Sequence, residues 1–62
     1  MTRRQEQVLA LVAEGFTDQE IAAELGVKME TVKSHMKNLR AALGARNRAH
    51  AVAIGMREGL IA

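Results

Sequence analysis

The part of the chain that most constrains its fold is residues 17–44, where two amphipathic stretches follow one another with almost nothing between them. In the first stretch, Ile21 and Leu25 recur at the spacing of one helical face, and in the second Val32 and Leu39 recur in the same way. Neither stretch shows the alternation of polar and apolar residues that a strand requires. Two short helices joined by a tight connection are therefore predicted for this segment.

Gly26 and Val27 form the centre of that connection. Glycine adopts the positive φ of a sharp turn without strain, and Val27 can fill the angle between the two helices. Ala22 is small where the helices cross, and a preceding helix with Val8 and Leu9 can supply the third side of the core. A plain helical hairpin is the alternative, but the combination of small, glycine and apolar positions favours a helix-turn-helix.

Capping signals divide the whole chain, residues 1–62, into the four helices of a single all-α domain. Thr2 and Thr17 begin capping boxes, and Asn47 can cap the last helix. Lys28 stands where the third helix needs a cap, and lysine is a poor capping residue. The predicted helices span about residues 3–14, 18–25, 29–43 and 48–58.

The composition excludes several classes of function. The chain has no cysteine, and its two histidines do not make a zinc site, so no metal or other cofactor is expected. There is no carboxylate pair, phosphate-binding glycine loop or nucleophile–base arrangement, so an enzyme is not expected. No apolar run approaches the ~20 residues that span a membrane, and no signal peptide is expected from the residues at the N-terminus. A cytoplasmic protein without a membrane partner is expected.

The charges are segregated along the chain. Residues 6–24 hold five acids and no cation, whereas residues 28–48 hold six cations and one acid. Such a pattern is consistent with a basic surface directed at a polyanion, and equally with an ordinary solvated face. The helix-turn-helix favours the first interpretation, a surface directed at a polyanion, because the second helix of such a motif enters the DNA major groove. Lys33 and Lys37 lie on the outer face of that helix, with Ser34 between them, where they can meet base edges.

The sequence also resembles the LuxR-type (GerE-like) helix-turn-helix domain over nearly its whole length. The residues that carry the resemblance are Val8, Leu9, Gly15, Glu20, Ile21, Ala22, Leu25, Gly26, Thr31, Val32, Lys33, His35, Leu43, Gly44, Arg48, Gly59 and Leu60. The resemblance implies a four-helix, transcription-factor domain of bacterial or phage origin that binds double-stranded DNA in the nucleoid as a dimer. RNA polymerase is a further candidate partner.

The resemblance also assigns roles to individual residues. It implies that Lys33, Ser34 and Lys37 read bases. The positions expected to contact phosphates are Lys28, Thr31, Arg40 and Arg48. Lys28 departs from the serine that is usual in the family, which puts the normal cap of the third helix in doubt.

The family's usual dimer surface is the last helix. On that helix we expect Ala49, Val52 and either Gly55 or Met56 to face the core. Ala51 and Ile54 are then expected to be exposed and to form a small dimer interface, too small to hold the dimer together firmly without DNA. Two-fold symmetry predicts inverted half-sites on the DNA.

Two other readings remain at the level of sequence. Region 4 of a sigma factor shares part of the pattern, but nothing like residues 47–61 follows it there. A protein-interaction module could use the last helix for binding and carry the basic face incidentally. His35 is expected to be partly buried with a backbone partner, and no partner can be identified for His50.

Overall fold

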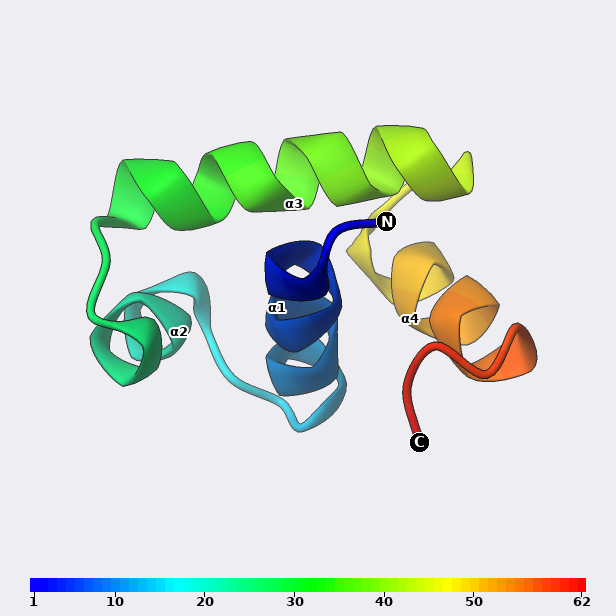
Figure 1. Ribbon diagram of the computed structural model, residues 1–62, viewed down its shortest axis with the longest axis horizontal. Helices are drawn as coiled ribbons and strands as arrows, with labels where there is room; N and C mark the ends of the chain where they lie inside the picture. The colour runs from blue at the N-terminus through cyan, green and yellow to red at the C-terminus, as the bar shows by residue number, and fades with distance from the viewer.

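Four helices form one bundle in the computed structural model, which describes all residues 1–62. They are α1 (Arg3–Ala13), α2 (Asp18–Leu25), α3 (Met29–Leu43) and α4 (Arg48–Arg57). α3 lies across the other three helices, with α1 beneath its middle and α2 and α4 towards its two ends (Figure 1). The all-α fold and the four helices are confirmed, and α1 and α4 each end one residue earlier than predicted. None of the helices is long and apolar enough to cross a membrane.

Local chemistry accounts for where the helices begin. The Thr2 and Thr17 hydroxyls accept hydrogen bonds from the N–H groups of Gln5 and Glu20, and the Gln5 and Glu20 side chains accept from the two threonine N–H groups in return. Both predicted capping boxes are therefore present. The side chain of Lys28 makes no cap hydrogen bond, so α3 begins without one.

The turn between α2 and α3 has the geometry that its sequence predicts. Gly26 has a φ of 67°, in the left-handed region that favours glycine, and the Val27 N–H donates to the Ala22 carbonyl at 3.0 Å. Val27 then packs against the core. α2 and α3 therefore form a helix-turn-helix, and α1 closes its open side.

Nine hydrophobic side chains are buried, and residues from all four helices contribute. They are Val8, Leu9, Ile21, Ala22, Val32, Met36, Leu39, Ala51 and Ile54. The apolar stripe of α3 is thus inside, as predicted. Phe16, Val12, Leu25 and Leu43 are partly buried around it.

The predicted orientation of α4 is wrong. Ala51 is fully buried and Ile54 is 7% exposed, although both were expected at the surface, and Ala49, which was expected in the core, is exposed. Val52 is half-buried against the core, and of the alternatives Gly55 and Met56 it is Gly55 that is buried. Ala51 and Ile54 therefore belong to the core and cannot form a dimer surface in the folded domain. The prediction failed because nearly every residue from 49 to 56 is apolar, so the periodicity of the sequence does not favour one face.

Gly55 explains how closely α4 packs. It is buried, and a Cβ added there would lie 2.7 Å from Cδ2 of Leu9 and 3.3 Å from the Ile61 side chain. A larger residue at this position would therefore force the Leu9 side chain to shift, so glycine suits the close approach of α4 to α1. Of the two explanations for a glycine inside this helix, simple tolerance and close helix contact, the contact is the correct one.

Replacing Ile54 with glutamate tests the corrected orientation of α4. Ile54→Glu places a carboxylate in a core that has no partner for it, so we expect a loss of more than about 3 kcal/mol in the free energy of unfolding. Met56→Glu makes the same chemical change two residues away on an exposed position and should alter it by less than about 0.5 kcal/mol. Urea titrations followed by circular dichroism measure both. Equal effects of the two variants would contradict the orientation described here.

Candidate nucleic-acid interface

The outer face of α3 carries exposed cations. Because Val32, Met36 and Leu39 point inward, helical geometry turns Lys33 and Lys37 outward, and Ser34 lies on the same side. All three side chains are exposed, and neither lysine has an acidic partner within ion-pair distance. Their charges are thus free to meet an external anion.

The beginning of α3 adds to this face. Lys28 is exposed, and because no side chain caps the helix, the N–H groups of its first turn lack a side-chain acceptor. A helix N-terminus of this kind favours an anion through both its free donors and its dipole. Thr31, in the first turn, is half-buried. Lys28 and Thr31 therefore lie at the end of α3 that is best suited to a phosphate.

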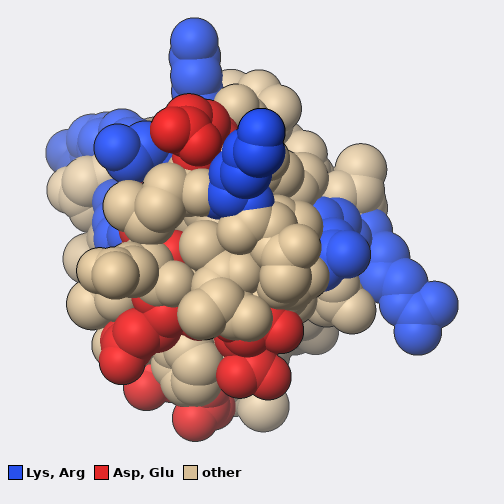
Figure 2. All heavy atoms as spheres, turned by 90° about the vertical axis from the view of Figure 1, so that its left-hand side faces the viewer, with Lys and Arg blue, Asp and Glu red and all other residues tan.

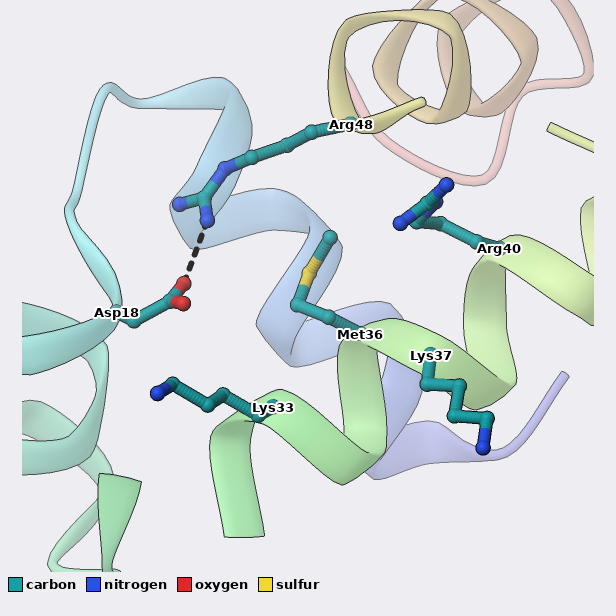
Figure 3. Close-up of a pocket in the computed structure, with 6 residues that line it drawn as sticks. All are labelled: Asp18, Lys33, Met36, Lys37, Arg40 and Arg48. Carbon is teal, nitrogen blue, oxygen red and sulfur yellow. Dashed lines mark hydrogen bonds and ion pairs between the residues drawn. The ribbon is translucent and has the colours of Figure 1, made fainter. Parts of the chain in front are cut away.

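A depression of about 240 Å³ lies between α3 and the first residues of α2 and α4 (Figure 3). Its lining residues are Asp18, Lys33, Met36, Lys37, Arg40 and Arg48. Four of these six side chains are cations from α3 and α4, and one is an acid from α2. Four residues predicted to contact DNA, three from α3 and Arg48 from α4, thus line one depression.

Arg48 is already engaged in the free domain. Its Nη1 lies 2.5 Å from Oδ1 of Asp18, and its Nη2 donates to the Phe16 carbonyl at 2.8 Å. These contacts attach the start of α4 to the turn between α1 and α2. The charge of Arg48 is largely offset by Asp18, so Arg48 is first a structural residue here, whatever it contacts when DNA is present.

Asp18 was missed by the sequence analysis. Asp18 follows the capping residue Thr17 and is the first residue of α2. An acid at that position is ordinarily explained by its favourable interaction with the helix dipole. Thirty positions separate Asp18 from Arg48, and nothing local in the sequence indicates their pairing. The charge balance of the two segments, one acidic and one basic, was the only available indication of contacts between them.

Arg40 and His50 organise the loop between α3 and α4. Nη2 of Arg40 donates to the Arg46 carbonyl at 3.1 Å, and the Arg46 N–H donates to Nδ1 of His50 at 3.0 Å. His50 thus has the partner that could not be identified from sequence. Nε of Arg40 is buried without a hydrogen-bond partner, so this donor does not reach the surface of the depression.

His35 does not behave as predicted in one respect. It is half-buried, as expected, but it makes no hydrogen bond to the backbone or to another side chain. The prediction of a backbone partner is therefore wrong. No group of three or more histidine, cysteine or acidic side chains is placed to hold a metal ion.

The folded domain keeps the charge segregation that its sequence shows. Basic side chains gather at the upper part of the face in Figure 2, where α3 lies, and acidic side chains at the lower part, below α2. The upper and lower parts of this face therefore differ in the sign of most of their charged side chains. A polyanion would be attracted to the α3 side and repelled from the opposite one.

Comparisons with known proteins agree with this geometry. The profile of a family described as "Bacterial regulatory proteins, luxR family" (GerE) matches residues 1–54. The probable transcriptional regulatory protein SgaR of Hyphomicrobium methylovorum is 48% identical over 54 residues, which are 87% of this chain and 26% of that protein. The chain therefore spans about a quarter of the length of this curated relative.

Two solved structures share the fold. The transcription factor GerE superimposes with a TM-score of 0.95 over 100% of this chain and 92% of that chain, at 24% identity. The response regulator ChrA of a heme-sensing two-component system superimposes with a TM-score of 0.93 over 97% of this chain and 30% of that chain, at 28% identity.

A double-mutant cycle measures what the pair between α2 and α4 contributes to stability. Both side chains are partly exposed, so Asp18→Asn and Arg48→Ala should couple by less than about 1 kcal/mol, and the coupling should weaken at high salt. Arg48→Ala alone should destabilise more than Asp18→Asn, because it also removes the hydrogen bond to Phe16. Urea titrations at low and high salt measure these effects. Equal costs of the two single variants would contradict the role given to the Phe16 carbonyl.

Proposed function

Because the chain belongs to the luxR family of bacterial regulatory proteins, as a DNA-binding domain of a transcriptional regulator, we propose that α3 reads specific sequences in the major groove. Lys33 and Lys37 donate to guanine O6 and N7, and Ser34 is small enough to let the helix approach the bases. The observation that carries this proposal is that the two lysines are exposed and unpaired on the side of α3 opposite the core.

Phosphate contacts position α3 in this proposal. Lys28 and Thr31 meet the backbone at the N-terminal end of the helix, and Arg40 adds its positive charge at the depression that it lines. Arg48 is paired with Asp18 in the free domain, and a phosphate would have to compete with that carboxylate. We therefore assign Arg48 a weaker contribution to DNA binding than the other cations. Affinity should accordingly fall as the salt concentration rises, because these cations release the counterions condensed on the phosphates when they bind.

The dimer surface that we propose is the exposed face of α4, now with different residues. Ala49, Ala53 and Met56 are exposed on one side of the helix, roughly opposite the buried Ala51 and Ile54, and the half-buried Val52 lies beside them. Met56 is 52% exposed and is the largest apolar side chain of this face. One helix pair buries less than the ~1,000 Å² of a stable interface, so the dimer is weak without DNA.

A two-fold axis through α4 sets the form of the DNA site. Two recognition helices on the same side of the duplex require inverted half-sites about 10 base pairs apart, centre to centre. As part of a regulator, such a dimer would act on RNA polymerase at the promoter. The sigma-factor alternative is disfavoured by α4, whose Ala51 and Ile54 complete the core. If the domain were instead a protein-interaction module, the cationic face of α3 would not bind DNA.

Alanine substitutions on α3 test the assignment of base-reading residues. Lys33→Ala or Lys37→Ala should weaken binding to a selected DNA site by about 1–3 kcal/mol and reduce discrimination against mutated sites. Arg57→Ala removes one exposed cation from the end of α4 and serves as the matched control on a single half-site. Fluorescence anisotropy with specific and random duplexes measures both properties. Unchanged binding by both lysine variants would overturn the assignment of α3.

A charge introduced on the exposed face of α4 tests the dimer. In a symmetric pair Met56→Glu brings two like charges together, so cooperative binding to a duplex with two half-sites should be lost while binding to one half-site remains. Gln7→Glu adds the same charge on the exposed side of α1 and should preserve cooperativity. Gel-shift titrations distinguish singly and doubly bound DNA. Cooperative binding by Met56→Glu would place the dimer surface elsewhere.

A further inference from the structure

The reading face of α3 contains one acid among its cations. Glu30 precedes Lys33, Ser34 and Lys37 by three, four and seven residues, the spacing of a single helical face. It is exposed, makes no ion pair or hydrogen bond, and is the only acid between residues 28 and 48. An acidic side chain is visible among the basic ones in the upper part of Figure 2. A carboxylate on a surface proposed to bind DNA requires an explanation, because it repels the phosphates.

We infer that Glu30 is a specificity-determining residue that accepts a hydrogen bond from the N4 amino group of a cytosine in each half-site. This inference rests on the proposed function, because it requires α3 to lie in the major groove. The N-terminal residues of a recognition helix are those that meet base edges, and Glu30 is the second residue of α3. Its position therefore matches the region of closest approach.

The chemistry of a carboxylate makes the choice of base narrow. An ionised carboxylate only accepts hydrogen bonds. In the major groove guanine presents two acceptors and thymine one, and adenine places the N7 acceptor beside its N6 donor, whereas cytosine presents the N4 donor without a neighbouring acceptor. Opposite guanine or thymine, Glu30 would be desolvated and face another acceptor, which is unfavourable. Glu30 thus favours cytosine and rejects other bases.

The same carboxylate limits binding to incorrect sequences. The positive charges of Lys28, Lys33, Lys37 and Arg40 attract any duplex through its phosphates, and this electrostatic part of the binding free energy does not depend on sequence. Glu30 opposes that attraction everywhere and is compensated only where cytosine supplies a donor. Specificity of this kind depends on a repulsive contact as well as an attractive one.

The alternative role for Glu30 is to stabilise the N-terminal end of α3 without contacting a base. An acid in the first turn stabilises the helix dipole, and α3 has no capping side chain. That role predicts a change in thermal stability and no change in base preference. The two roles are thus distinguished by the sequence of the bound DNA.

Selection from a random duplex pool followed by sequencing tests the inference, with the unmodified domain, Glu30→Gln, Glu30→Ala and the matched control Glu24→Gln. The unmodified domain should select a half-site with one cytosine whose replacement lowers affinity roughly tenfold, the size of one base-edge contact. Glu30→Ala should lose the preference at that position alone, and Glu30→Gln should shift it to adenine, which glutamine can contact through N6 and N7. Glu24→Gln removes the same charge from α2 and should select the unaltered site.

The outcomes separate this inference from the proposed function. If the unmodified domain selects no sequence, the proposed function is overturned and the inference with it. If it selects a site that both Glu30 variants also select with the same preference at every position, the inference alone is overturned. A lower melting temperature of Glu30→Gln accompanied by that unchanged site would assign Glu30 to the helix end.

Discussion

The packing of α3 on the other three helices is the contact on which the rest of the domain depends. Val32, Met36 and Leu39 are buried, and a helix that buries one stripe must expose the opposite one. The same contact that stabilises the bundle therefore sets the direction in which Lys33 and Lys37 point. In a chain of 62 residues, which buries only roughly 60% of its unfolded surface, there is little else to hold α3 in place, so stability and recognition depend on the same side chains.

The other helices support α3 in different ways. α2 and the turn at Gly26 determine the angle at which α3 leaves the bundle, and α4 contacts α1 where Gly55 permits it. Arg48 then connects α4 to Asp18 beside the recognition face. The cations that line the depression consequently come from α3 and α4, although the residues proposed to read bases come from α3 alone.

The sequence predicts what local chemistry determines. Thr2, Thr17 and Asn47 mark helix starts that the structure reproduces, because a cap depends on atoms a few residues away. The core stripe of α3 was predictable for the same reason, since its polar and apolar positions alternate clearly at helical spacing. The proposed roles of Lys33, Ser34 and Lys37 remain predictions, although their exposure is what those roles require.

What the sequence could not predict depends on contacts between distant residues. The orientation of α4 is set by the approach of Gly55 to Leu9, and a helix with apolar residues on every side offers no periodicity from which to infer it. Ala51 and Ile54 were therefore assigned to the wrong face. The pairing of Asp18 with Arg48 escaped prediction because it links positions that neither share a helix nor follow a motif.

The measurement that tests the account most directly is a nuclear magnetic resonance titration of the ¹⁵N-labelled domain with a short duplex. If the outer face of α3 meets DNA, the backbone amides around Lys33, Ser34 and Lys37 should shift most, and those of Leu11 and Glu14 on the opposite, acidic side of the molecule should remain unchanged. Shifts concentrated on α1 and α2, with the amides of α3 unaffected, would contradict the account.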